Sequence, residues 1–266
     1  MTLTIDPARY TNLSVVDHED GVWVVTLNRP KKRNALDIDT IEELVEFFST
    51  APRAGVRAVV LAGSGDHFCA GLDLVEHHDQ DRSPADFMHV CLRWHEAFNK
   101  MEYGGVPVIA ALKGAVVGGG LELASSTHVR IAEDSTIFQL PEGRRGIFVG
   151  GGATARVGRL LGPDRMTEMM LTGRKYNAAE GLALGLTHYA VGEGEALPLA
   201  QQLAGKIARN APLSNYLMIQ SIARINDMSQ SDGLFTESLA AALSQTTPDA
   251  EEGLKAFLEK RAPKFR

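Results

Sequence analysis

Two short apolar runs constrain the fold more strongly than any other feature of the sequence. Residues 58–62 and 108–112 contain only apolar side chains, and a glycine follows each run within two positions. Such runs are typical of strands that are covered on both faces, as in parallel sheets. Residues 22–27 add a third predicted strand, because they are rich in β-branched and aromatic residues and end at an Asn-Arg-Pro turn.

Helical patterns connect and follow these strands. Apolar residues recur every three or four positions over residues 38–48, with Asp39 as the candidate N-cap. From about residue 152 the pattern is mostly helical, with helices predicted at 156–171, 178–184, 196–209, 213–227 and 231–245. We therefore expect an α/β fold, with a catalytic core over residues 1–200 and a helical C-terminal region over residues 201–266.

Composition excludes several classes of function. The 266 residues include 27 Lys and Arg against 33 Asp and Glu, so a formal charge of −6 provides no basic field for nucleic acid or an anionic membrane. No apolar run approaches the ~20 residues of a membrane span, and no signal peptide is evident, which predicts a soluble cytoplasmic protein. The two cysteines, Cys69 and Cys91, are too few for a disulfide framework. The histidines show no metal-ligand spacing, so we expect no metal.

A glycine run is the first candidate for chemistry. Residues 116–123 combine a strand-like start, the glycines Gly118, Gly119 and Gly120, and a helix-like continuation. This arrangement points backbone N–H groups at an anion. Residues 68–73 follow a predicted strand and a flexible turn, and they can also present free amides. A tight turn or close backbone packing is the alternative interpretation of the glycines.

Two carboxylates strengthen the case for a catalytic site. Glu122 follows the glycine run, and Glu142 lies twenty positions later, after Pro141. Paired carboxyl groups can share acid and base roles. The alternative is that each is an ordinary acidic residue in the first turn of a helix, where the helix dipole favours negative charge.

Several motifs occur together in one order along nearly the whole chain. They are Asn28-Arg29-Pro30 with Asn34-Ala35-Leu36, Phe68-Cys69-Ala70-Gly71-Leu72-Asp73, Pro107-Val108-Ile109-Ala110-Ala111, Gly118-Gly119-Gly120-Leu121-Glu122-Leu123, Pro141-Glu142, and Ala256-Phe257-Leu258-Glu259-Lys260-Arg261. In these motifs the chain resembles the enoyl-CoA hydratase/isomerase, or crotonase, superfamily. The resemblance implies a spiral core of ββα units and a C-terminal helical region that forms a homo-trimer or a dimer of trimers. It also implies an acyl-CoA thioester substrate and no cofactor beyond the coenzyme A of that substrate.

The same resemblance implies a catalytic site. The backbone N–H groups of Ala70 and Gly119 would hold the thioester oxygen, on which negative charge accumulates during reaction. Glu122 would activate water for attack on C3, and Glu142 would deliver a proton to C2. Because both glutamates are present, hydration is favoured over the alternatives of enoyl-CoA isomerisation and acyl-CoA hydrolysis.

Further residues are expected to bind coenzyme A by resemblance. Arg29, Lys32, and Lys264 of the same or a neighbouring subunit would meet the CoA phosphates, although a solvated cation is the alternative for each. Leu72 and Asp73 would line the path of the adenine and pantetheine groups, and Cys69 and Gly118 are also expected to contact the CoA or acyl part of the substrate.

The chain departs from the family pattern after Glu142. Arg144 and Arg145 replace apolar residues, and Val149 replaces a proline. Two arginines beside a catalytic loop are suited to a polar or carboxylated acyl tail, with a solvated face or subunit contact as the alternative. His128 stands where the family often has an aspartate, and we interpret it as structural.

Two other classes of function compete with this interpretation. Gly150, Gly152 and Ala155 fit a G-x-G-x-x-A pattern after the apolar residues 147–149, which would indicate a dinucleotide-dependent oxidoreductase if a strand preceded it. The other candidate is a non-catalytic acyl-CoA-binding protein, a role against which the presence of both glutamates argues.

Overall fold

Two β-sheets organise the protein, whose computed structural model describes residues 3–265. The larger sheet has the strand order β1 (Leu13–Asp17), β2 (Val22–Leu27), β3 (Ala58–Gly63), β4 (Val108–Leu112), β6 (Val129–Glu133) and β9 (Tyr189–Val191). Only the β1–β2 pair is antiparallel in this sheet. The smaller sheet has the order β5 (Ala115–Val117), β7 (Ile137–Gln139) and β8 (Tyr176–Asn177). The predicted α/β fold and the three predicted strands are confirmed.

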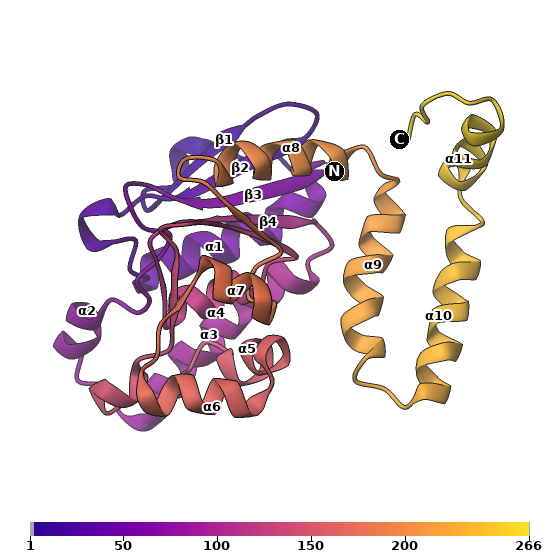
Figure 1. Cartoon of the computed structure of the whole chain (residues 1–266). Coiled ribbons are helices and arrows are strands. Elements are labelled where there is room, and N and C mark those ends of the chain that lie inside the picture. Colours follow the sequence, from indigo (N-terminus) through magenta and orange to yellow (C-terminus); the bar gives the residue numbers. More distant parts are fainter. Residues whose placement is uncertain (1–2, 266) are drawn as a thin grey trace.

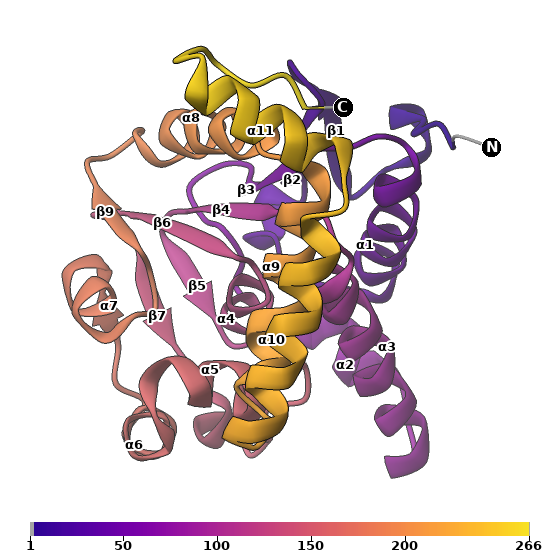
Figure 2. The same cartoon turned by 90° about the vertical axis from the view of Figure 1, so that its right-hand side faces the viewer.

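Helices cover the two faces of the larger sheet (Figures 1 and 2). On one face lies α8 (Ala196–Ala208), and on the other lie α1 (Ile38–Thr50), α3 (Pro84–Tyr103) and α4 (Gly119–Ser125). Successive side chains of a strand point to opposite faces, so Val60 packs under α8 while Val59 and Leu61 pack toward the other helices. The alanines of α8, at positions 196, 200, 204 and 208, are buried against this sheet.

Local capping and helix-breaking residues correct two of the predicted boundaries. The N-cap of α1 is Asp37, whose carboxylate accepts the amide of Thr40 at 2.8 Å, and the predicted cap Asp39 lies inside the first turn. The helix predicted over 156–171 is divided into α5 (Ala153–Leu161) and α6 (Pro163–Thr172). Gly162, at φ +80°, ends α5, and Pro163 begins α6. The sequence patterns did not predict α3.

The remaining helices and 3₁₀ turns complete the chain. They are η1 (Pro7–Arg9), η2 (Pro30–Lys32), η3 (Ala51–Arg53), α2 (Leu74–Asp79), η4 (Glu142–Arg145), α7 (Ala178–Leu184), α9 (Pro212–Ile225), α10 (Gln230–Ser244) and α11 (Pro248–Leu258). Among the described residues, none of the helices combines the length and apolarity that a bilayer span requires.

The C-terminal helices α9, α10 and α11 stand beside the core (Figure 1). Arg159 of α5 joins this region through an ion pair with Asp227 at 2.9 Å. The boundary predicted at residue 200 falls within α8, which packs on the sheet as part of the core. The structural extension therefore begins with α9.

Candidate active site

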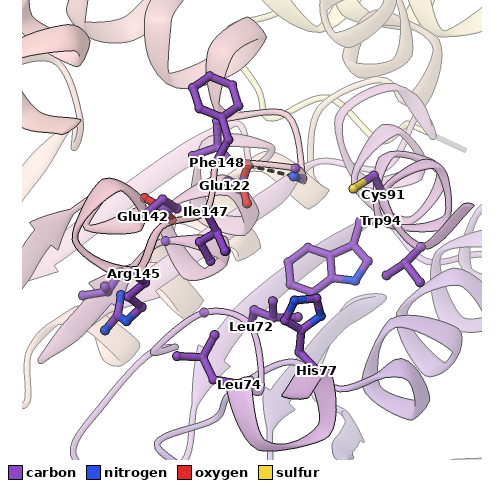
Figure 3. Close-up of a pocket in the computed structure, with 18 of the residues that line it drawn as sticks. Leu72, Leu74, His77, Cys91, Trp94, Glu122, Glu142, Arg145, Ile147 and Phe148 are labelled. Atoms are coloured by element: carbon purple, nitrogen blue, oxygen red, sulfur yellow. Dashed lines mark hydrogen bonds between the residues drawn. The ribbon is translucent and has the colours of Figure 1, made fainter. Parts of the chain in front are cut away.

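One cavity gathers residues from four distant parts of the chain (Figure 3). It encloses about 710 Å³ of empty space, part of which is open to solvent. Its lining comes from the segment after β3, from α2 and α3, from the start of α4, and from residues 142–151. Of the predicted site residues, the lining includes Ala70, Leu72, Gly118, Gly119, Glu122, Glu142 and Arg145.

Two backbone amides beside this cavity have no hydrogen-bond partner among residues 3–265. Gly119 is the first residue of α4, so its N–H has no partner within the helix. A Cβ placed on Gly71 would lie 3.0 Å from this nitrogen, which puts it beside the 70–72 segment. The amide of Leu72 makes no hydrogen bond within residues 3–265, and its nitrogen is 3.4 Å from where a Cβ on Gly119 would stand.

The amide of Ala70 is already used inside the fold. It donates to the carbonyl of Arg33 at 3.0 Å, so the structure does not support its predicted role as a free donor. Gly71, at φ +95°, turns the chain between Ala70 and Leu72, and the two amides therefore meet different surroundings. In the described part of the chain, the unpaired amide beside Gly119 is therefore that of Leu72 and not that of Ala70.

Glu122 projects from the first turn of α4 and is only 3% exposed. Its Oε1 accepts the amides of Gly151 at 2.8 Å and Ala153 at 3.0 Å. Burial, reinforced by the negative charge of Glu142, raises the pKa of Glu122 to about 7 against the opposing effect of the two amides. A carboxyl group with this pKa can exchange a proton near neutral pH.

Glu142 begins η4 and is 7% exposed. Its Oε2 is buried without a hydrogen-bond partner in the described part of the chain. Burial raises the pKa of Glu142, and the nearby charge of Arg145 opposes that rise. A Cβ at Gly118 would stand 2.7 Å from Glu142 Oε1, so glycine leaves room for this carboxyl group. Both glutamates do lie in first turns of helices, but they also face one cavity.

Three of the predicted substrate contacts have polar partners within the fold. The guanidinium of Arg29 lies between the carboxylates of Asp37 and Asp73, at 2.9 Å from each. Cys69 is fully buried, and its Sγ accepts the amide of Gly71 at 3.4 Å. None of Arg29, Cys69 and Asp73 lines the cavity. Partners within the fold occupy the polar groups of these residues, and a contact of any of them with coenzyme A remains a prediction.

The remaining predicted cations differ in position. Arg145 lines the cavity, whereas Arg144 lies over Gly173 outside it, and a Cβ there would meet Arg144 Cδ at 2.8 Å. Lys32 and Lys264 are exposed and lie outside the cavity lining. Contact of either lysine with a CoA phosphate remains a prediction.

The apolar wall of the site was not predicted from the sequence. Trp94 of α3 packs against two glycines of the site, since a Cβ on Gly119 or Gly151 would come within 2.6 or 2.9 Å of its ring. His77, Phe87 and other residues of α2 and α3 extend the wall. The helical spacing of the buried residues Trp94, Ala97, Phe98 and Met101 is the signal that could have identified it.

The structure does not provide the context that dinucleotide binding requires. Residues 147–149 form no strand before the Gly150 and Gly152 pair. The amides of Gly151 and Ala153, which a pyrophosphate would need, bind Glu122. His128 accepts the Val108 amide at 2.9 Å, in agreement with a structural role. Residues 3–265 contain no cluster of three or more side chains that could hold a metal ion.

Known proteins resemble the chain over nearly its whole length. Residues 17–266 match the family model described as enoyl-CoA hydratase/isomerase. The short-chain-enoyl-CoA hydratase of Clostridium acetobutylicum is 34% identical, with 94% of this chain and 96% of that protein covered. The 2,3-dehydroadipyl-CoA hydratase of Escherichia coli is 33% identical, with coverages of 95% and 98%. The crystal structure of an enoyl-CoA hydratase from Bacillus anthracis has a TM-score of 0.91 at 33% identity, covering 96% of this chain and 99% of that one. The chain therefore belongs to the enoyl-CoA hydratase/isomerase family.

Proposed function

We propose that the protein hydrates a 2-trans-enoyl-CoA to a 3-hydroxyacyl-CoA. The observation that carries this proposal is the pair of buried carboxyl groups, Glu122 and Glu142, beside the two free amides of Leu72 and Gly119. Members of this family act on acyl-CoA thioesters, and relatives named as hydratases cover almost the whole chain.

The amides of Leu72 and Gly119 would hold the thioester oxygen. Addition of water to C3 moves negative charge onto that oxygen, and preorganised donors at about 2.7–3.1 Å stabilise this charge. The apolar wall around Trp94 lowers the local dielectric constant around the bound thioester, which strengthens these hydrogen bonds. The site thus favours the enolate-like state over the bound substrate.

The two glutamates would divide the proton transfers. Glu122 accepts a proton from water through Oε2 as the water oxygen bonds to C3, since Oε1 is held by two amides. Protonated Glu142 donates its proton to C2. Return of one proton from Glu122 to Glu142 then restores the starting state, and the two groups titrate as a coupled pair.

A panel of 2-enoyl-CoA thioesters tests this function. Loss of the conjugated absorbance together with a mass gain of one water identifies hydration. A shifted double bond without mass gain would identify an isomerase, and release of free coenzyme A would identify a hydrolase. Hydration that persisted at the wild-type rate in the double variant Glu122→Gln/Glu142→Gln would exclude the assigned mechanism.

The rate should depend on pH through Glu122. Only the ionised carboxylate can accept a proton from water, and the pKa of Glu122 is about 7. We therefore expect kcat/KM to be low well below this pH, to rise as Glu122 ionises, and to fall again at higher pH, where Glu142 loses the proton that it must donate to C2. A pH profile with an inhibitor-free buffer series measures the midpoint. A midpoint near 4.5, the ordinary value for a glutamate, would contradict the role of burial.

Arg145 is the residue that we propose meets a polar or carboxylated acyl tail. It is exposed in the cavity lining, and it makes no hydrogen bond or ion pair with any residue from 3 to 265. We expect Arg145→Leu to raise KM about tenfold for a substrate with a terminal carboxylate, the loss of one charged hydrogen bond. Arg144→Leu is the matched control outside the cavity. Equal effects of Arg145→Leu on carboxylated and purely apolar substrates would contradict this role.

We propose that the C-terminal helices form the subunit contacts of the homo-trimer or dimer of trimers that the family resemblance implies. Phe235 on α10, and Phe257 and Leu258 on α11, are between 65% and 81% exposed in the single chain. Large apolar surfaces of this kind mark protein contacts. Sedimentation equilibrium should give three or six times the mass of one chain, and Phe257→Glu should shift the distribution toward smaller species. A wild-type protein that remained monomeric at micromolar concentration would exclude the assembly.

A further inference from the structure

The turn at residues 150–152 sets the orientation of Glu122. The amides on either side of Gly152 come from Gly151 and Ala153, and both donate to Glu122 Oε1. Gly152 reaches this geometry at φ +108°, which other residues rarely adopt. The second oxygen of Glu122, Oε2, makes no hydrogen bond within the described chain. The turn therefore determines which oxygen is available for chemistry.

A buried arginine binds this turn through the Gly151 carbonyl. Arg156 of α5 is 9% exposed, and its Nη1 donates to the carbonyl of Gly151 at 3.3 Å. Two residues of α3 fix the same guanidinium. Its Nε donates to Glu102 Oε2 at 2.5 Å, and its Nη2 donates to Asn99 Oδ1 at 2.6 Å. All three guanidinium nitrogens are thus held by the protein, and Arg156 itself lies outside the lining of the active-site cavity.

We infer that Arg156 is a positioning residue for Glu122, acting through the Gly151 peptide. The guanidinium of Arg156 is fixed by α3 and donates to the Gly151 carbonyl. This contact fixes the turn whose amides bind Glu122 Oε1, and Glu122 Oε2 is then available to the substrate. The inference rests on the proposed function only in assigning Glu122 as the base; the chain of contacts is independent of the reaction.

The charges around Glu122 predict the direction in which its pKa changes when Arg156 is removed. The charged groups that act on Glu122 are Glu142 from η4 and Arg156 from α5, while the charge of Glu122 itself raises the pKa of the Cys91 thiol on α3. The charge of Arg156 and the two amides all lower the pKa of Glu122 against the effect of burial. Removing Arg156 takes away its charge and loosens the amides, and both changes raise that pKa.

Arg156→Met and Arg156→Lys test the inference. We expect kcat to fall about 10- to 100-fold in Arg156→Met with KM nearly unchanged, because a small misplacement of a reacting group costs rates of this order. The midpoint of the pH profile should move above that of the wild type. Arg156→Lys retains the charge but not the three-way geometry, so it should recover part of the midpoint shift and little of kcat.

Arg159→Met provides the matched control. Arg159 lies one turn further along α5 and pairs with Asp227 at the surface, outside the active-site cavity. Its removal should leave kcat and the pH midpoint unchanged. If Arg156→Met folds and matches Arg159→Met in both quantities, Arg156 is only structural and the inference is overturned.

A readout without turnover separates this inference from the proposed function. Carbon-13 NMR of labelled glutamate carboxyl groups, with the Glu122 signal assigned by its loss in Glu122→Gln, follows the ionisation directly. The Glu122 midpoint should rise in Arg156→Met even if the wild type does not hydrate enoyl-CoA. If Arg156→Met fails to fold, Asn99→Ala removes one anchor and should lower kcat about threefold, the loss of roughly one hydrogen bond. Unchanged kcat and an unchanged Glu122 midpoint in Asn99→Ala would overturn the inference.

Discussion

Replacing Glu142 with glutamine is expected to lower kcat for hydration by about 10²- to 10⁴-fold, the usual contribution of a general acid. Glutamine has the same shape as glutamate but cannot transfer a proton to C2. Because the side-chain volume is conserved, KM should change little. Steady-state kinetics on a 2-enoyl-CoA thioester measures both quantities, and Glu122→Gln, which removes the base instead, should give a loss of similar size.

Thermal unfolding separates this loss of chemistry from a loss of folding. The pKa of Glu142 is raised by burial, so its stabilising contribution is present below the unfolded pKa and is lost as the pH rises through the folded pKa. Glutamine removes that dependence, and at alkaline pH the variant should be at least as stable as the wild type. A folded Glu142→Gln protein with kcat within tenfold of the wild type would show that Glu142 is not the proton donor.

Removing the N–H of Leu72 is expected to lower kcat by about 10²- to 10³-fold, as losing one donor of an oxyanion hole does. The leucine α-hydroxy acid at position 72 replaces the amide with an ester and keeps the side chain. The N–H of Leu72 has no partner among residues 3–265, so the stability cost should come only from the Gly71 carbonyl, which becomes an ester and accepts the Leu36 amide more weakly. Kinetics and thermal unfolding of the ester protein measure the two effects.

The same substitution at Ala70 is the matched control. It removes the hydrogen bond to the Arg33 carbonyl, so it should lower stability by about 1 kcal/mol and leave kcat within a few-fold. The two esters therefore have opposite expected profiles. A large loss of kcat at position 70 and none at position 72 would restore Ala70 as the donor and exclude Leu72.

Three central strands of the larger sheet and most helices could be predicted from the sequence because their signals are local. An apolar run such as residues 58–62 predicts a strand covered on both faces, and the structure buries every residue of it. The break between α5 and α6 was also a local signal, since Gly162 and Pro163 end and begin helices. The long α3 was missed, although its buried residues have helical spacing.

The types of residue in the site were likewise evident in the sequence, but their partners were not. By itself, the sequence determined that two glutamates and a glycine run accompany an α/β fold. Only the tertiary structure decided that the Ala70 amide donates to the Arg33 carbonyl, while the Leu72 amide has no partner among residues 3–265. The ion pairs of Arg29 with Asp37 and Asp73 were likewise decided by the tertiary structure. The physical reason is that an amide or a guanidinium is available to a ligand only if no other group of the fold binds it. Those groups lie up to dozens of positions away in the chain and meet only when the sheets and helices pack.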